Sequence, residues 1–299
     1  MTGPVPDTPD APPDVLLDVL LDVDTGVDDA LALLFALRCP RLRLLGVGCV
    51  EGNVGVDQVL VNTLTVLSAA GAGDVPVAAG AQRPLLEPPS EGRSGHGEDG
   101  LADLGLPPPA RAADPRHAVE LLRDLLLAAA DPVTVVGLGP ATNLALLLRT
   151  HPEVAERIAR LVLVVGAPPE EAADFNAAHD PEALAVVLGA GLPVRTYGID
   201  MIAQVTLDPA ADVLGAGDDS GIQLARRLLR HRSRLGDAGA LTAMIFPAAV
   251  HTERRLLRVG LCGEERGRLV PDPTGVPVDV VTSVAADVLA RGLAATITS

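Results

Sequence analysis

Residues 16–37 read LLDVLLDVDTGVDDALALLFAL, and this stretch decides the fold. It starts as an apolar run that ends at Asp22 and Asp24, passes through a Thr-Gly pair, and continues from Asp28 and Asp29 as a second apolar segment. The first run predicts a buried strand, and acidic residues after the turn are typical of the first turn of a helix. Four carboxylates are therefore expected at one strand-to-helix junction.

Apolar strand-like runs alternate with helical patterns along most of the chain. Strands are expected at residues 15–23, 42–50, 75–79, 133–138, 161–166, 194–198 and 278–282, and helices at about 27–38, 56–70, 116–130, 140–149, 180–190, 218–234 and 283–292. Continuously apolar strands alternating with helices are typical of a parallel sheet covered on both faces, with ligands at the carboxyl ends of its strands. We therefore predict an α/β fold with a mostly parallel central sheet flanked by helices.

The chain shows no internal repeat and no shift in composition that would divide it, so one domain is expected over residues 14–299. Residues 1–13 contain neither a basic region nor an apolar stretch, and we expect a disordered leader there. Residues 80–112 cluster Gly, Pro, Ser and charged side chains and predict a long loop. A loop of this length inside a compact domain is usually functional or disordered.

The charge balance limits the possible partners. The chain has 39 acidic and 23 basic residues, a net charge of −16, and its field repels phosphate backbones and anionic membrane surfaces. Its three cysteines show no Cys-x-x-Cys spacing, which argues against a disulfide framework and a thiolate zinc site. No apolar run reaches the roughly 18 residues of a membrane span. We expect a soluble, cytoplasmic protein that binds neither nucleic acid nor membranes.

The acidic junction at residues 22–29 has two interpretations. Asp28 and Asp29 can simply favour a helix N-terminus that Thr25 caps, which explains two of the four carboxylates at most. Like charges within about 4–6 Å of each other oppose folding, so the whole cluster favours a cation or a shared proton. Oxygen ligands alone select Ca²⁺ or Mg²⁺. Phosphatases of the haloacid dehalogenase type also start with Asp-x-Asp, but Gly26 stands where they are expected to have Thr.

The junction closely resembles the signature of the inosine-uridine-preferring nucleoside hydrolase family, Asp-x-Asp-Pro/Thr-Gly-x-Asp-Asp-Ala. Further landmarks of that family follow in order along nearly the whole chain. They are Gly52-Asn53, Gly95-His96-Gly97, Leu138-Gly139-Pro140-Ala141-Thr142-Asn143, Asp174-Phe175-Asn176 and Asp180-Pro181-Glu182-Ala183. The resemblance implies a hydrolase that cleaves the N-glycosidic bond of a ribonucleoside or related N-riboside.

The same resemblance implies a metal site. It places a Ca²⁺ on Asp24, on Asp29 and on the backbone carbonyl of Leu138, with Asp24 taking the proton of the attacking water as general base. Asn53 would orient Asp24, although Gly-Asn is also an ordinary turn pair. His96 would lie near the base, although a histidine between glycines is equally often a solvated surface group.

The resemblance also implies a ribose site. Asp28 and Asn176 would bind sugar hydroxyls, and Asp174 stands where the family usually has Glu. Phe175, between the last two residues, belongs to the same substrate-binding segment. A transition state with oxocarbenium character would be stabilised by carboxylates around the sugar.

One part of the family pattern is expected to be missing. The family has a His-Asp pair before Pro-x-Ala-Val, in which Asp completes the Ca²⁺ shell and His helps to protonate the departing base. The best-matching stretch here, residues 244–250, has Ile245 and Phe246 at these positions, and a register based on His251 would place Thr252 at the acid position. We therefore expect a weakened metal site.

Two functions remain open at this point. One is a divergent hydrolase, favoured because Asp24 and Asp29 are present. The other is a protein of the same fold that binds a ribose-containing ligand without efficient turnover. The sequence does not identify the base, because the loops at 80–112 and 218–250 would select it. The resemblance further implies a homodimer or homotetramer.

Overall fold

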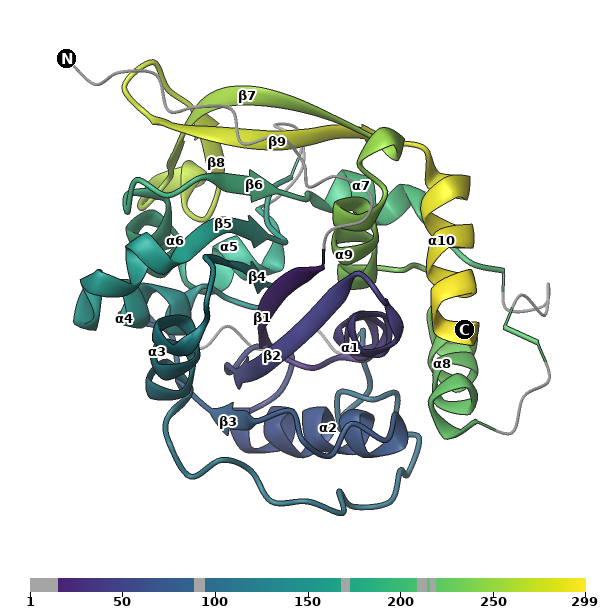
Figure 1. Cartoon of the computed structure of the whole chain (residues 1–299). Helices are drawn as coiled ribbons and strands as arrows, with labels where there is room; N and C mark the ends of the chain where they lie inside the picture. The colour runs from purple at the N-terminus through teal and green to yellow at the C-terminus, as the bar shows by residue number, and fades with distance from the viewer. Residues whose placement is uncertain (1–15, 89–94, 168–172, 209–213, 216–218) are drawn as a thin grey trace.

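The computed structural model describes residues 16–88, 95–167, 173–208, 214–215 and 219–299. The expected leader at 1–13 lies outside these residues. Within them, nine strands form a single sheet in the order β3-β2-β1-β4-β5-β6-β9-β7-β8 (Figure 1). The strands are β1 Leu17–Val23, β2 Leu42–Cys49, β3 Val77–Ala79, β4 Val133–Gly137, β5 Ile158–Leu163, β6 Val194–Thr196, β7 Val250–Val259, β8 Leu269–Pro271 and β9 Val276–Val284.

Every neighbouring pair from β3 through to β9 is parallel, and β7 is antiparallel to both β9 and β8. Asp22 in β1 pairs with Gly48 in β2 and with Gly137 in β4. Because these strands are parallel, the residues that follow them leave the sheet side by side at its carboxyl edge. The register thus brings Asp24 next to Leu138.

Helices cover both faces of the sheet (Figure 1). Those of one layer are α1 Val27–Arg38, α2 Val56–Ala69, α8 Ser220–His231, α9 Asp237–Ile245 and α10 Ala286–Thr298, and those of the other are α3 Ala118–Ala128, α4 Thr142–Thr150 and α6 Pro181–Leu188. Two short helices, α5 Phe175–His179 and α7 Ile199–Gln204, follow β5 and β6. No helix in the described part of the chain has the length and apolar character needed to cross a membrane.

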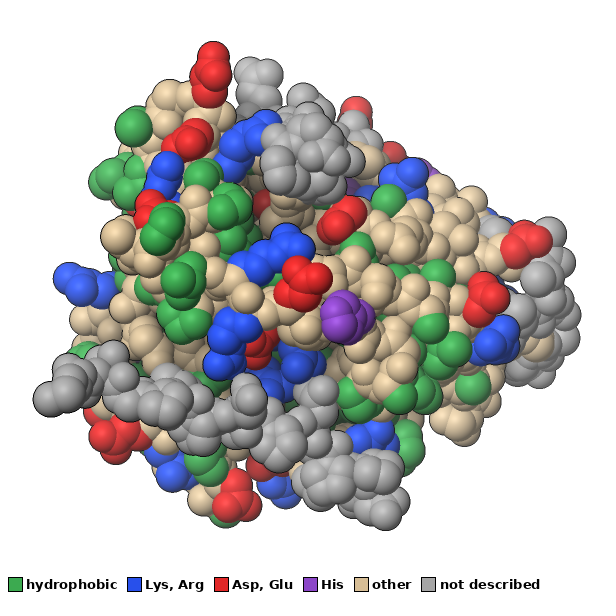
Figure 2. Space-filling model, turned by 90° about the horizontal axis from the view of Figure 1, so that it is seen from above, with side chains coloured by type: hydrophobic (Ala, Val, Ile, Leu, Met, Phe, Trp, Pro, Cys, Tyr) green, Lys and Arg blue, Asp and Glu red, His purple; other side chains and the backbone are tan. Residues whose placement is uncertain are grey.

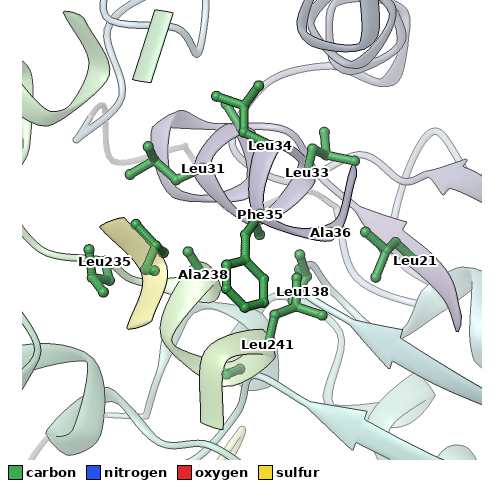
Figure 3. Close-up of a cluster of buried hydrophobic side chains, with 14 of the residues drawn as sticks. Leu21, Leu31, Leu33, Leu34, Phe35, Ala36, Leu138, Leu235, Ala238 and Leu241 are labelled. Atoms are coloured by element: carbon green, nitrogen blue, oxygen red, sulfur yellow. The ribbon is translucent and has the colours of Figure 1, made fainter. Parts of the chain in front are cut away.

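Helix α1 is buried along almost its whole length, from Val27 to Ala36. Phe35 is fully buried and projects toward α9, where it joins Leu138, Ala238 and Leu241 in one hydrophobic cluster (Figure 3). A helix that is apolar all round belongs in the interior, and close packing restricts its movement. This packing holds the first turn of α1, with its acidic residues, at the carboxyl edge of the sheet.

The mostly parallel sheet and its flanking helices confirm the predicted fold. Each predicted strand corresponds to an observed one, although β5 begins at Ile158, before the expected start at residue 161. Residues 80–112 contain no helix or strand in their described part, as expected. The prediction missed β7, β8, α5, α7 and α9. Strand β7 carries exposed charges, and α9 is too uniformly apolar to show a helical period.

Candidate active site

A cavity of about 540 Å³ opens at the carboxyl edge of the parallel strands. Its lining includes, from the residues expected on sequence grounds, Asp24, Asp28, Asn53, His96, Leu138, Asp174, Phe175 and Asn176. The structure therefore brings together residues from widely separated parts of the chain. Asp29 is the exception, because it is fully buried behind the lining residues.

Asp24 follows β1 and is only 2% exposed. The backbone N–H of Asn53 donates to its Oδ2 at 2.9 Å, and the Asn53 side-chain Nδ2 donates to the Asp24 carbonyl at 3.3 Å. A side chain at Gly52 would place its Cβ 2.2 Å from Asp24 Oδ2, so only glycine allows this close approach. The Gly-Asn pair thus orients the Asp24 carboxylate.

Asp29 lies in the first turn of α1. Its Oδ2 accepts the backbone N–H of Gly26 at 2.9 Å, which closes the helix N-terminus. Its Oδ1 is buried and has no hydrogen-bond donor within the described part of the chain. Leaving a buried carboxylate oxygen without a partner is costly. Asp29 therefore does more than cap the helix, and its free oxygen is suited to a cation or a proton.

A third acid from a distant part of the chain joins Asp28 and Asp29. Asp237, the first residue of α9, is 6% exposed and lines the cavity. One carboxylate oxygen from each of Asp28, Asp29 and Asp237 lies within 4.8 Å of the others. Asp24 is outside this tightest group. The charge of Asp29 nevertheless reaches Asp24 and helps to raise its pKa.

These carboxylates oppose each other's ionisation. Burial raises the pKa of Asp24 and of Asp237 well above the usual value, and the negative charges of Asp29 and Asp28 raise them further. Burial also raises the pKa of Asp29 to about 7, again with a contribution from the charge of Asp28. A divalent cation would relieve this repulsion, because it favours the charged form of every group. The donor set of buried carboxylate oxygens therefore fits a hard divalent cation.

His96 lies against the start of α1. Its Nδ1 accepts the backbone N–H of Val27 at 3.0 Å and is 3.6 Å from Asp28 Oδ1. Burial lowers the pKa of His96, although the Asp28 charge opposes this shift. A neutral imidazole that accepts at Nδ1 carries its proton on Nε2. His96 is thus part of the cavity wall, in contact with Asp28, and is not a solvated loop residue.

Asp174 and Asn176 form the opposite part of the binding segment. Asp174 caps α5, with its Oδ1 accepting from Ala177 N at 3.0 Å and its Oδ2 from Gly166 N at 2.8 Å. Asn176 Nδ2 donates to the Leu138 carbonyl at 2.6 Å and to the Val164 carbonyl at 2.9 Å. The amide oxygen of Asn176 is left to accept from a ligand.

Asp22, the fourth acid of the expected junction, takes no part in the cavity. Its Oδ1 accepts from Asn143 Nδ2 at 2.8 Å, and Asn143 also donates to the carbonyl of Cys49 at 3.0 Å. Burial raises the pKa of Asp22 to about 7. Asp22 ties β1 to the first turn of α4, and the fourth acid of the cavity region is Asp237.

A family model described as inosine-uridine preferring nucleoside hydrolase matches residues 19–291. The chain belongs to this family. Among curated proteins it is 42% identical over 180 residues to the pyrimidine-specific ribonucleoside hydrolase RihA of Citrobacter koseri. This alignment covers 59% of this chain and 58% of the relative. It is 40% identical over 192 residues to the RihA of Salmonella paratyphi B, and that alignment covers 63% of this chain and 61% of the relative. The match spans about three fifths of the length of these curated relatives.

Solved nucleoside hydrolase structures share the fold over their full length. The plant nucleoside hydrolase PpNRh1 superposes with a TM-score of 0.87 at 25% identity, covering 96% of this chain and 100% of that one. An inosine-guanosine nucleoside hydrolase superposes with a TM-score of 0.88 at 26% identity, covering 95% and 99%. The purine-preferring ribonucleoside hydrolase of Gardnerella vaginalis superposes with a TM-score of 0.81 at 26% identity, covering 94% of this chain and 99% of that one.

The structure brings to the cavity of this nucleoside hydrolase family member an acid that the sequence analysis did not single out. Asp237 supplies a buried carboxylate beside Asp28 and Asp29. Ile245 is buried in the core, and Phe246 packs against α10, where a Cβ at Gly292 would lie 2.5 Å from its ring. Neither side chain lines the cavity, so the Pro-Ala-Ala-Val stretch does not lead to a residue of the site. A Gly-Asp pair at the start of an apolar segment was the signal that could have found Asp237.

The histidine of the family pair has no counterpart next to this acid, since Gly236 precedes Asp237. Gly236 has a φ of +52°, and a Cβ there would lie 2.0 Å from Asp28 Oδ2. The close approach of Gly236 to Asp28 therefore excludes any side chain at this position. A protonating group for the leaving base has to come from elsewhere or is absent.

Proposed function

We propose that this protein hydrolyses the N-glycosidic bond of a ribonucleoside or related N-riboside. The observation that carries the proposal is the buried group of Asp24, Asp28, Asp29 and Asp237 around a cavity at the carboxyl edge of a nucleoside hydrolase fold. Acids at this density suit both a divalent cation and a reaction that develops positive charge on a sugar.

In this proposal Asp24, Asp29, Asp237 and the Leu138 carbonyl would hold a Ca²⁺. When bound, the ion supplies Lewis-acid chemistry that eases the loss of a proton from the attacking water. Asp24 accepts that proton, because the Asn53 N–H fixes one of its oxygens at 2.9 Å and leaves the other free.

The sugar is held by groups on both sides of the cavity. Asp28 accepts from ribose hydroxyls, and Asn176 accepts through the amide oxygen that its own contacts leave free. Asp174 is already committed to capping α5, so its contribution is chiefly the negative charge near the sugar. These carboxylates stabilise the oxocarbenium character of the transition state.

A second function, ligand binding without efficient turnover, is favoured by one observation. Gly236 takes the place next to Asp237 where a protonating histidine is expected, and Asp28 leaves no room for a side chain there. A general acid typically contributes about 10²- to 10⁴-fold to a rate. Bases that need a proton to leave would then depart slowly.

The test is release of reducing sugar from a panel of purine and pyrimidine ribonucleosides in the presence of Ca²⁺. The panel is needed because the relatives named above include both pyrimidine-specific and purine-preferring enzymes. Wild-type protein is compared with D24N, which removes the proposed base. D57N, a substitution of an exposed acid in the first turn of α2, is the matched control. Sugar release by D24N equal to wild type would contradict the role of Asp24.

A further inference from the structure

The cavity also contains cationic side chains that hydrolysis of a neutral nucleoside does not require. Arg232 and Arg234 follow helix α8, and both line the cavity. The transition state proposed above develops positive charge on the sugar, and a guanidinium facing the same cavity opposes that charge. Carboxylates line the same cavity, so the contacts of each arginine decide whether a positive charge is left for a ligand.

The contacts of Arg232 do not satisfy its guanidinium. One nitrogen is 3.0 Å from His96 Nε2 and 3.7 Å from Asp28 Oδ2. His96 Nδ1 already accepts the Val27 N–H, so a neutral imidazole carries its proton on the Nε2 that faces Arg232. Two donors then face each other, and the distance to Asp28 exceeds that of a hydrogen bond. Among the described residues, Arg232 therefore has Asp28 as an ion-pair partner but makes no hydrogen bond to a carboxylate.

Arg234 has no acceptor at all among the described residues. Its side chain is exposed, and neither a hydrogen bond nor an ion pair connects it to that part of the chain. Its backbone is nevertheless held firmly. Leu207 N donates to Ser233 O at 2.8 Å, and Leu235 N donates to Val205 O at 3.0 Å. These bonds on both sides fix the place from which the Arg234 side chain reaches the cavity.

We propose, on the basis of the proposed function, that the riboside bound here carries an oxyanion, a carboxylate or a phosphate, that Arg232 and Arg234 recognise. A guanidinium presents paired N–H donors that match both groups. The bound anion would also neutralise the arginines during the reaction, so they would no longer oppose positive charge on the sugar. The anion is either a phosphate on the ribose 5′-oxygen or a carboxylate on the base.

The test compares the affinities of anionic ribosides with that of their neutral parent. Uridine, uridine 5′-monophosphate and orotidine, which carries a carboxylate on the uracil ring, are titrated by calorimetry into D24N protein with Ca²⁺, so that no ligand is consumed. We expect one anionic compound to bind at least about tenfold more tightly than uridine. The compound that does so identifies which group the arginines recognise.

Charge-removing variants assign the preference to the two arginines. In R232Q and R234Q, made in the D24N background, the preference for the anionic compound over uridine should fall about tenfold or more. R149Q is the matched control. Helix α4 begins at the carboxyl edge of the sheet, and the exposed Arg149 lies at its other end, in the last turn. Its preference should match that of the parent protein.

The proposal is overturned if neither anionic compound binds more tightly than uridine, including the case in which none binds detectably. It is also overturned if R234Q weakens uridine and the anionic compound equally, since Arg234 would then act on the sugar or the base. Hydrolysis of the same compounds by wild-type protein is measured in parallel. A clear anion preference without any hydrolysis would reject the proposed function and retain this inference.

Discussion

Asp237 is the acid of the cavity that the sequence analysis did not find. The side chains of Asp28, Asp29 and Asp237 bring carboxylate oxygens within 4.8 Å of one another, and Asp29 Oδ1 has no hydrogen-bond donor within the described residues. The sequence motif placed Asp24, Asp28 and Asp29 correctly at one edge, because all three follow a single predicted strand. It could not place Asp237, because contacts between distant segments bring that residue to the site.

Removing Asp237 should weaken calcium binding. The D237N variant loses one anionic oxygen donor from a site whose affinity depends on the number and charge of its ligands, so the Kd for Ca²⁺ should rise about tenfold or more. Without metal the variant should be as stable as wild type or more stable, because repulsion with Asp28 and Asp29 is relieved. Calorimetric titration with Ca²⁺ measures the affinity, with D57N as control. Unchanged affinity in folded D237N would remove Asp237 from the metal site.

The buried acids also predict a pH dependence of stability. The pKa of Asp22 and of Asp29 is raised from 3.8 to about 7, and that of Asp174 to about 6, mainly by burial. Between about pH 4 and 7 the folded chain therefore holds protons that the unfolded chain has lost, so stability decreases as the pH rises through this window. The lowered pKa of His96 acts in the opposite direction, but it is one group against several.

In the presence of a chelator, the Tm should thus be higher at pH 5.5 than at pH 7.5. Added Ca²⁺ should reduce the difference, since the ion stabilises the ionised carboxylates. D22N should reduce it as well, because the amide removes one titrating group and still offers an oxygen to Asn143. A Tm that increases steadily from pH 5.5 to 7.5 in the chelated protein would show that the buried carboxyl groups do not hold protons in the folded state.

At the scale of elements, the site is built where the first turns of α1 and α9 meet. Asp28 and Asp29 lie in the first turn of α1, and Asp237 lies in the first turn of α9. The partial positive charge of a helix N-terminus stabilises nearby anions, which offsets some of the repulsion among the three acids. The sequence predicted α1 from its position after a strand. It did not predict α9, whose nine residues are apolar enough to be buried on all sides.

Gly236, at the start of α9, should be intolerant of any side chain. In G236A the new Cβ would clash with Asp28 Oδ2, and the alanine backbone would have to adopt a strained positive φ. The free energy of unfolding should therefore fall by about 2–4 kcal/mol. The matched control is G71A, where φ is +72° and no atom lies within 4 Å of the added Cβ. That variant should lose only about 1 kcal/mol. Urea unfolding of both measures the difference, and equal losses would show that Gly236 does not touch Asp28 in solution.

At the scale of the whole molecule, the mostly parallel sheet followed from the alternation of apolar strands and helices. The antiparallel edge did not follow from the pattern. Strand β7 is rich in exposed charges such as Arg254 and Arg255, and its partner β9 is separated from it in the chain by β8. The cavity lies at the predicted edge. Its cationic side, however, depends on the loop after α8, and loop geometry cannot be derived from hydrophobic periodicity.

The arginines of the outer surface differ from those of the cavity. The space-filling view from above shows basic and acidic side chains interspersed on this face of the molecule (Figure 2). Arg254 pairs with Asp279 at 3.0 Å, and Arg258 pairs with Glu265 at 2.6 Å. In an acidic chain of net charge −16, arginines with nearby carboxylates are the rule. Arg234 faces the cavity without such a partner among the described residues, and it is therefore informative about the ligand.

The most direct test of the proposed activity is hydrolysis of p-nitrophenyl riboside, whose leaving group needs no proton and whose release is followed by colour. With Ca²⁺ the wild-type protein should cleave it about 10²- to 10⁴-fold faster than uridine or inosine, because no protonating group stands beside Asp237. Chelation of the metal and the D24N substitution should each abolish the reaction, while D57N should not. Absence of cleavage by folded wild-type protein with Ca²⁺, or undiminished cleavage by D24N, would contradict the claim that this cavity is a riboside hydrolase site.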